Sequence, residues 1–381
     1  MASLSKVAIR YHFVSLKDPR VRGRTQHRLL DIIVIAICGV IADCDSWREI
    51  ELFAQQRAAW FKRFLSLRQG IPSHDTLERV FDRIDPRAFS LCFVRWVQAL
   101  SACLPVAQIA IDGKTARRSF DQSSGLGPLH LVSAWATQQH LTLGQVAVDG
   151  KSNEITAIPP LLELLDLKGA LVTLDAMGCQ KDIAAKIVAG GGDYVLTVKD
   201  NQERLHQDIQ ATIEQALDGG LRPASVSQHE SRERGHGREE MRSYVVVSCL
   251  DHIRDRTLWS KLTVVGMCYS ERTVKGKTSA ETRYFIGSRP MSARRYGQTL
   301  RNHWSIENSL HWQLDVSFGE DDNRVQKRHA AANLSQMRRG AISLLKQNCS
   351  KLSLRGKRKK ASLNTDFLVE LLRGHQHPEK L

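Results

Sequence analysis

The sequence predicts an α/β core, preceded by an all-helical N-terminal domain and interrupted by a β-rich insertion. Three observations predict this architecture. Apolar residues recur at helical spacing through much of residues 1–105. Beyond them, short apolar strands alternate with helical stretches, which indicates parallel pairing within a mixed sheet. Strand-like segments separated by turns then gather at about residues 220–290.

The N-terminal domain contains several helices with recognisable starts. Residues 27–43 are densely apolar and predict a buried helix. Ser46 and Glu49 have the spacing of a capping box, in which each side chain accepts a hydrogen bond from the backbone N–H of the other residue. Another helix is expected to start within 72–77, and a further one spans 86–100.

The core is expected to alternate strands and helices from residue 106 to residue 346. Strands are predicted at 108–112, 129–137, 142–148, 171–175 and 194–198, and helices at 154–165 and 180–189. Pro159 and Pro160 predict a break or a late start in the helix at 154–165, because an internal proline removes a hydrogen bond. A long amphipathic helix is expected at 329–346. Residues 347–381 are interpreted as a basic C-terminal tail, mobile around the GKRKK run.

The stretch between Asp175 and Glu307 is too long for a simple loop, so an insertion is expected there. Its strands are predicted at 225–229, 243–248, 262–269 and 282–286. Residues 231–238 form a glycine-rich basic hairpin within it. This hairpin could hold phosphates through arginine and backbone N–H groups, or it could be a solvated turn.

Three carboxylates far apart in the sequence suggest one site. Asp112 follows the apolar residues 109–111 and precedes Gly113, which is expected to turn the chain. Asp175 follows a second apolar strand, and Glu307 lies on a helix expected at 294–312. Oxygen ligands of this kind hold Mg²⁺, and two such ions can drive phosphoryl transfer. Taken singly, an aspartate at a strand end is often only a turn residue or a helix N-cap.

Composition narrows the class of partner. The 381 residues carry a net charge of +15 and are 42% hydrophobic, which indicates a folded protein with a polyanionic partner. The longest apolar run, 29–42, is shorter than a membrane-spanning helix requires, and no signal peptide is evident. The eight cysteines form no CxxC pair, which argues against a zinc site or disulfide framework and suits a cytoplasmic protein.

Several segments resemble one known family. They are IDGKTARRS, DGKSNEITAIPPLLELLDLKGALVTLDAMGCQ, YVLTVKDNQ, RERGHGREE and RNHWSIENSLHWQLDVSFGEDDNRVQ. Together they resemble the H-repeat-associated transposases of bacterial insertion sequences over about residues 13–346. The resemblance implies a ribonuclease-H-like core with a DDE triad of Asp112, Asp175 and Glu307. It also implies that these residues bind Mg²⁺, with Mn²⁺ as a substitute, and that Asp112 bridges two ions.

The same resemblance implies a function. The chain is expected to cleave duplex DNA at element ends and to join the 3′-OH to target DNA, as a homodimer in a nucleoid-associated, cytoplasmic complex. DNA contacts are expected from Lys114, Arg232, Arg234, Arg238, Arg301 and His303, and the N-terminal domain is either a further DNA surface or a plain helical bundle. A ribonuclease-H-like nuclease without strand transfer, and a catalytically silent DNA-binding relic, are the alternatives.

The sequence departs from a pattern that many such transposases share. They carry Tyr-x-x-Arg-x-x-x-Glu, followed by Lys at the seventh position. At those offsets from Glu307 this chain has Leu300, His303 and Leu314, so only His303 is considered for a phosphate contact. Trp304 and Trp312 are interpreted as core residues. The carboxylates at 320–322 are interpreted as a polar turn, with a substitute metal ligand as the alternative.

Overall fold

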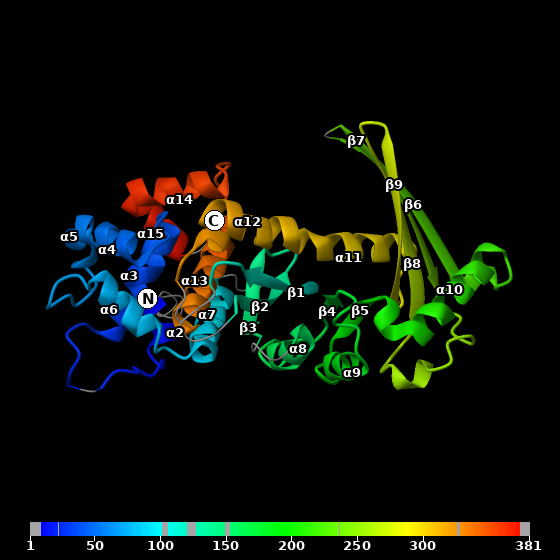
Figure 1. The fold of residues 1–381 in the computed structure, drawn as a ribbon, viewed down its shortest axis with the longest axis horizontal. Helices are drawn as coiled ribbons and strands as arrows, with labels where there is room; N and C mark the ends of the chain where they lie inside the picture. The colour runs from blue at the N-terminus through cyan, green and yellow to red at the C-terminus, as the bar shows by residue number, and fades with distance from the viewer. Residues whose placement is uncertain are drawn as a thin grey trace, which may run out of the picture. The chain divides into compact units, whose positions relative to one another are not determined.

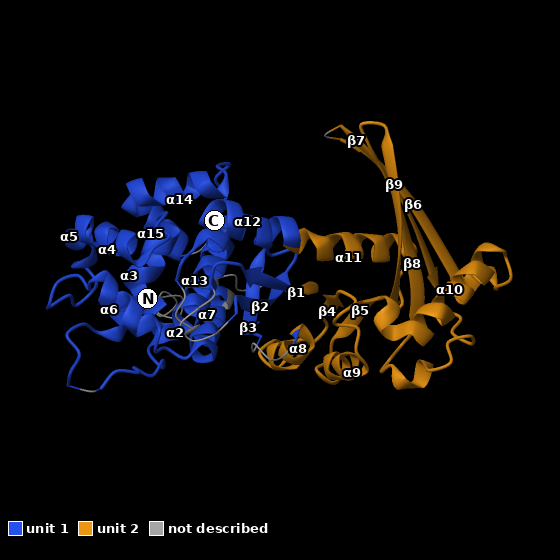
Figure 2. Cartoon of the chain, in the orientation of Figure 1, with its two compact units in different colours: residues 1–105, 113–153, 307–381 blue, residues 106–112, 154–306 orange. Residues whose placement is uncertain are grey.

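The computed structural model describes residues 9–21, 23–100, 106–119, 127–148, 153–235, 237–325 and 328–373. Parts of the expected first domain (1–8, 22 and 101–105) and the last residues of the expected tail (374–381) therefore lie outside the described chain. Two compact units are present (Figure 2). Unit 1 comprises residues 1–105, 113–153 and 307–381, and unit 2 comprises residues 106–112 and 154–306. The chain passes between the units directly after Asp112 and directly before Glu307.

The N-terminal helices of unit 1 begin where local sequence favours them. They are α2 (Ile9–Phe13), α3 (Leu29–Ile41), α4 (Trp47–Gln56), α5 (Ala58–Phe61), α6 (His74–Phe81) and α7 (Pro86–Leu100). The predicted capping box of Ser46 and Glu49 is confirmed at the start of α4, and Ser73 caps α6. α3 is buried along nearly its whole length. These boundaries confirm the helices predicted at 27–43 and 86–100 and the helix start predicted within 72–77.

The N-terminal helices share unit 1 with later parts of the chain. Those parts are the hairpin of β2 (Leu129–Ala136) and β3 (Leu141–Ala147), the π-helical turn η4 (Glu307–His311), α12 (Trp312–Phe318), η5 (Glu320–Asp322), α13 (Arg328–Gln347), α14 (Leu354–Leu363) and α15 (Thr365–Arg373). α13 approaches α7 closely at Gly340, where an added Cβ would lie 1.8 Å from the Phe93 ring. The helices of residues 9–100 thus form one core with the C-terminal part of the chain.

The expectation of a mobile basic tail is wrong for residues 354–373, which form α14 and α15. The GKRKK run lies within α14, and its Lys357 and Arg358 are buried. Lys357 Nζ donates to the carbonyl oxygens of Leu345 and Asn348, at 2.9 and 2.7 Å. The GKRKK run was interpreted as solvated because the carbonyl and carboxylate groups that accept hydrogen bonds from it lie in other parts of the sequence.

Unit 2 is built on a mixed sheet (Figure 1). Its strands are β1 (Gln108–Ala116, of which 108–112 belong to this unit), β4 (Leu171–Leu174), β5 (Asp193–Val198), β9 (Lys277–Gly287), β8 (Val264–Val274), β7 (Arg238–Val247) and β6 (Val226–Gly235), in that hydrogen-bonded order. β1, β4 and β5 are parallel, and β9, β8, β7 and β6 continue antiparallel. The four predicted strands of the insertion are confirmed as β6–β9.

The helices of unit 2 are α8 (Glu154–Leu162), α9 (Lys181–Ala189), α10 (Glu203–Leu217) and α11 (Ala293–Ile306), with short turns η1 (Asp200–Gln202), η2 (Pro223–Ser225) and η3 (Arg256–Leu258). α11 packs on the sheet through Tyr296, whose ring stacks on Phe285 at 5.1 Å between centroids. Gly287 makes this possible, since an added Cβ there would lie 2.2 Å from the Tyr296 hydroxyl.

Two local expectations are corrected here. The chain does not turn at Gly113, because β1 continues through it to Ala116. α8 has no break or late start, since it begins at Glu154 and runs through Pro159 and Pro160. Tertiary packing outweighs the cost of the prolines in α8, which buries Ala157, Ile158, Leu161 and Leu162.

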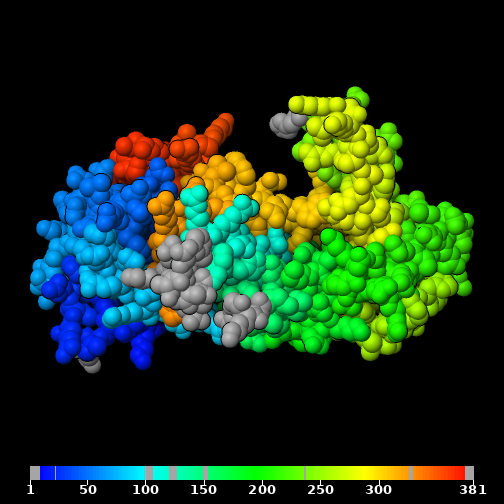
Figure 3. Space-filling view, in the orientation of Figure 1, coloured from blue at the N-terminus to red at the C-terminus, as the bar shows by residue number. Residues whose placement is uncertain are grey.

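The outer halves of the insertion strands project from unit 2 (Figures 1 and 3). Residues 277–282 of β9 are all exposed, whereas Phe285, Ile286 and Gly287 at its other end are buried. Nearly all of β6 is half-buried or exposed as well. Within the part of the chain that the structure describes, no helix combines the length and apolarity that crossing a membrane requires.

Candidate active site

Asp112 and Asp175 follow paired positions on neighbouring parallel strands of unit 2. Ile111 of β1 pairs with Leu174 of β4, and each aspartate is the next residue along its strand. Neighbouring strands lie about 4.8 Å apart, so the two backbones run side by side at this point. Ligands gather at the carboxyl ends of parallel strands, and both aspartates lie at the carboxyl end of the β1–β4 pairing. Asp112 is half-buried.

The loop after Asp175 is held by its own backbone and by the segment after β5. The Gly178 N–H donates to Asp175 Oδ1 at 3.2 Å. Asn201 Nδ2 donates to the Ala176 carbonyl at 2.7 Å, and Gln202 Nε2 donates to the Cys179 carbonyl at 3.0 Å. Neighbouring atoms desolvate the Asp175 carboxyl and raise its pKa, although its outer side remains exposed. The sequence assigned no role to Asn201 and Gln202, which lie in the quoted segment YVLTVKDNQ.

The C-terminal end of α11 packs against the two strands that precede the aspartates. His303 Nδ1 and Thr173 Oγ1 are 2.9 Å apart, and Gln108 Nε2 donates to the Thr299 carbonyl at 2.8 Å. His303 is buried, so its ring belongs to the helix–strand contact and we propose no phosphate contact for it. Glu307 is the next residue after α11.

Glu307 and His311 lie on one wide helical turn of unit 1. η4 is a π-helical turn from Glu307 to His311, and such turns are frequent at functional sites. His311 Nδ1 lies 3.3 Å from Glu307 Oε2, with His311 buried and Glu307 exposed. His311 was missed from the sequence, although its spacing of four from Glu307 on a helix was a usable signal.

The donor chemistry of these residues fits a metal ion. Asp112, Glu307 and His311 are candidate metal ligands, each offering one ligand atom. Carboxylate oxygens are the ligands that Mg²⁺ prefers, and an imidazole suits Mn²⁺ and other transition metals as well. Asp175 is not in this group of candidates and was included from the sequence.

Lys114 was expected to contact phosphate, and the structure gives it protein partners in unit 1. Its Nζ lies 2.7 Å from Asp315 Oδ1, 3.2 Å from Asp321 Oδ1 and 3.9 Å from Glu320 Oε2. The side chain is buried. Residues 320–322 form the short turn η5, as the interpretation of a polar turn expected, and Glu320 within it is buried.

Three arginines of the β6–β7 hairpin, Arg232, Arg234 and Arg238, are exposed, and each has a glutamate beside it. Arg232 pairs with Glu230, Arg234 with Glu239 and Arg238 with Glu240. Arg301 on α11 pairs with Glu233 of the same hairpin through both of its terminal nitrogens. Surface pairs of this kind are weak and exchange readily with other anions.

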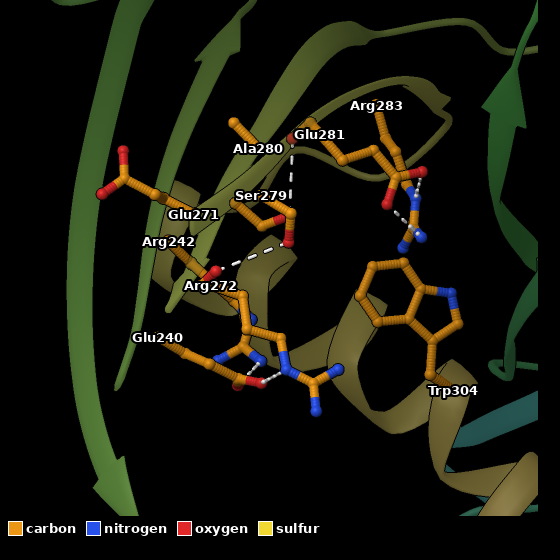
Figure 4. A pocket seen from close by; sticks show the side chains of 10 residues that line it. Glu240, Arg242, Glu271, Arg272, Ser279, Ala280, Glu281, Arg283 and Trp304 are labelled. Atoms are coloured by element: carbon orange, nitrogen blue, oxygen red, sulfur yellow. Dashed lines mark hydrogen bonds and ion pairs between the residues drawn. The ribbon is translucent and has the colours of Figure 1, made fainter. Parts of the chain in front are cut away.

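A groove of about 610 Å³ lies beside the insertion strands and α11 in unit 2 (Figure 4). Arg283 lies over the Trp304 ring, 3.9 Å from its centroid, and is held by Glu281. Trp304 therefore lines this groove, and Trp312 on α12 is exposed. The expectation that both tryptophans are core residues is wrong, because helical spacing alone does not show which face is covered.

Comparisons with known proteins agree with these features. A family model described as "Transposase DDE domain" matches residues 105–344, and a model described as "DDE_Tnp_1-associated" matches residues 10–97. The first match spans Asp112, Asp175 and Glu307 and covers more than half of the chain.

Individual relatives match over nearly the whole chain. The "H repeat-associated putative transposase YhhI" of Escherichia coli strain K12 is 38% identical over 372 residues, which are 95% of this chain and 97% of that protein. The "Putative transposase YncI" of Escherichia coli O157:H7 is 41% identical over 363 residues, 94% of this chain and 92% of that protein. A shorter relative from strain K12, "Inactive transposase YbfQ", is 35% identical over 69 residues, 18% of this chain and 82% of that protein. Similarity of this extent, in the domain model and in the full-length relatives, places the chain in the DDE transposase family, alongside its H repeat-associated members.

Proposed function

We propose that the protein is a Mg²⁺-dependent DDE transposase in which Asp112, Asp175 and Glu307 hold the metal ions. The observation that carries the proposal is the register of β1 and β4, which sets Asp112 and Asp175 after paired positions. The transposase domain match spans all three carboxylates. Mn²⁺ should replace Mg²⁺, since it accepts the same oxygen ligands.

The proposed reaction has two steps on duplex DNA. Water first cleaves a phosphodiester at each element end, and the released 3′-OH then attacks target DNA. Bound Mg²⁺ would supply a nucleophile at neutral pH and charge stabilisation on the phosphate. The chain supplies the fixed carboxylates, and His311 beside Glu307 orients that carboxylate. A homodimer would bring two ends together.

We also propose that exposed arginines of unit 2 contact the DNA backbone. Arg232, Arg234 and Arg238 extend from the β6–β7 hairpin, and Arg301 from α11 adjoins it. A phosphate can replace the glutamate beside each arginine, because an exposed ion pair is worth little in water. These contacts would carry affinity but no base preference.

A cleavage assay tests the proposed reaction. Purified protein is incubated with Mg²⁺ and the DNA that flanks its own gene, and nicks and joined products are mapped. Asp175→Asn removes a proposed metal ligand. It is therefore expected to lower cleavage by more than about 100-fold, which is the largest effect typical of residues that only support the ligands, while DNA binding is kept. The control is Asp200→Asn, which removes an exposed carboxylate of η1 in the same unit.

The same assay separates the alternatives. Ca²⁺ should support binding with little chemistry, because its coordination is looser than the octahedral shell of Mg²⁺. Specific binding without any cleavage by the wild type would indicate a relic, and nicks without joined products would indicate a nuclease. Near-normal cleavage by Asp175→Asn would remove that residue from the metal site.

A further inference from the structure

Lys114 is a buried ammonium group surrounded by three carboxylates of unit 1. Its side chain is 9% exposed, and Asp315, Asp321 and Glu320 lie 2.7, 3.2 and 3.9 Å from Nζ. Asp315 and Asp321 lie within hydrogen-bonding distance of the ammonium group, and Glu320 adds a third negative charge at longer range. Little remains with which Lys114 could bind a phosphate.

The carboxylates around Lys114 are themselves fixed. Glu320 accepts from Ser335 Oγ at 2.6 Å and from Arg339 Nη1 at 3.1 Å. Arg339 Nε in turn donates to Ser133 Oγ of β2 at 3.1 Å. Asp321 Oδ2 lies 3.4 Å from Arg117 Nε, so it is held from a second side. The ammonium is thus held in a rigid, charge-balanced setting.

The candidate metal ligands lie a few residues along the chain from this cluster. Lys114 is two residues after Asp112 on the continuous strand β1. Asp315 is four residues after His311 and eight after Glu307, on the helical stretch formed by η4 and α12. The Lys114–Asp315 pair therefore fastens the strand that follows Asp112 to the helix that carries Glu307.

We infer that Lys114 is a positioning residue of the metal site, which fixes the strand after Asp112 against the helix of Glu307 and His311. The inference rests on the proposed function for the identity of the ligands. Loss of the ammonium would leave Asp315 and Asp321 as surplus negative charge beside the site, free to attract a cation to the wrong place. Outer-shell residues of this kind typically change metal affinity by about 10- to 100-fold.

Metal affinity without DNA is the direct test. Mn²⁺ binding to the full chain is measured by calorimetry, together with the Mn²⁺ concentration for half-maximal cleavage. Lys114→Met is expected to raise the Mn²⁺ dissociation constant and the half-maximal Mn²⁺ concentration by about 10- to 100-fold each. Lys114→Arg keeps the charge and should lie closer to the wild type. The matched control is Lys186→Met, which removes a lysine paired with Glu163 in unit 2 and should change neither quantity.

DNA affinity separates positioning from phosphate contact. If Lys114 only positions ligands, Lys114→Met binds end DNA in Ca²⁺ with the wild-type affinity and salt dependence. A salt slope reduced by about one, with unchanged Mn²⁺ affinity, would show a phosphate contact and overturn the inference. Where Lys114→Met fails to fold, Asp315→Asn breaks the same pair more gently; a folded Asp315→Asn with wild-type Mn²⁺ affinity also overturns it.

The proposed function can fail separately. A wild type that binds Mn²⁺ but cuts no DNA disproves the transposase activity, and the Mn²⁺ affinity of Lys114→Met still decides the positioning role. A wild type that binds no Mn²⁺ disproves both.

Discussion

Two arginines of unit 1 and two arginines of the β6–β7 hairpin in unit 2 occupy opposite settings. In unit 1, Arg339 and Arg358 are completely buried, and each is bonded to a carboxylate and further polar groups. In unit 2, Arg232 and Arg234 are 76% and 82% exposed and pair with glutamates of their own hairpin. Arg339 and Arg358 contribute to the net charge of +15, but their charges are used within the fold and are not available to contact DNA. The comparison predicts that changing the buried arginines of unit 1 affects stability, whereas changing the exposed hairpin arginines of unit 2 affects DNA binding.

The largest expected effect is on Arg358 within the GKRKK run. Arg358→Gln should lower the free energy of unfolding by about 3–5 kcal/mol, because it removes a completely buried charge that bonds half-buried Asp45 and the buried Val40 carbonyl. Lys359→Gln, one residue away and exposed, should stay within about 0.5 kcal/mol of the wild type. Urea denaturation of both variants measures the difference. Equal effects would show that the run is solvated.

Glu320→Gln tests the other buried ion pair through pH. Burial alone would raise the pKa of Glu320, but Arg339, Arg338, the Ser335 hydroxyl and Lys114 outweigh it and hold the pKa below 4.5. The carboxylate therefore stabilises the fold above pH 4.5, and this stability is lost as pH falls through the lowered pKa. At pH 7 the variant should be less stable by about 3–5 kcal/mol.

The pH dependence has its own measurement. Thermal unfolding of wild type and Glu320→Gln between pH 7 and pH 3 should show the two converging at the acid end. A gap that stays constant with pH would mean that the carboxylate charge contributes nothing and that only the shape of the side chain matters.

The exposed hairpin should affect DNA binding instead. Arg232→Gln with Arg234→Gln should reduce the salt slope of DNA affinity by about 1.8, at about 0.9 for each phosphate contact. Stability should change by less than about 0.5 kcal/mol. The matched control neutralises Arg204 and Arg256, which are exposed in unit 2 and paired with Asp255 and Asp251. If the control reduces the salt slope as much, the hairpin arginines act only through general charge and make no specific contact with the DNA backbone.

The smallest expected effect is on the pair of Arg301 and Glu233. Hydrogen bonds from Arg301 hold the pKa of Glu233 below its usual value, yet both side chains are more than 40% exposed. A double-mutant cycle with Arg301→Gln and Glu233→Gln should give a coupling of about 0.2–1 kcal/mol. A coupling as large as that of the buried pairs would contradict the distinction between the two units.

Local sequence predicted the fold best where local chemistry decides it. The capping box of Ser46 and Glu49 involves residues three apart, and the insertion strands follow a pattern that requires only neighbours. Asp112 and Asp175 could be proposed together because both follow apolar strands. Pro159 and Pro160 were misleading, because the buried face of α8 outweighs the cost of two prolines.

The site could be predicted only in part, because its surroundings depend on distant partners. From the sequence, Lys114 and Arg358 look like solvated or DNA-binding residues. The carboxylates with which they pair lie about 200 or more and 313 or more positions away along the chain. Trp304 is distinguished from a core tryptophan by its contact with Arg283 and by its place in the lining of the groove. No periodicity in the sequence carries that information.

The π-helical turn at Glu307 changes how motif spacing should be counted in this chain. Seven residues make about two turns of an α-helix, so the lysine that many relatives carry seven positions after the glutamate shares its face. A π turn contains one extra residue in its hydrogen-bonded ring. The eighth residue, Asp315, therefore takes the place of the seventh, Leu314, which is buried. What stands there is a carboxylate, and the positive charge that reaches it comes from a strand, through Lys114. A search that uses fixed offsets would pass over this arrangement in any relative with the same extra residue.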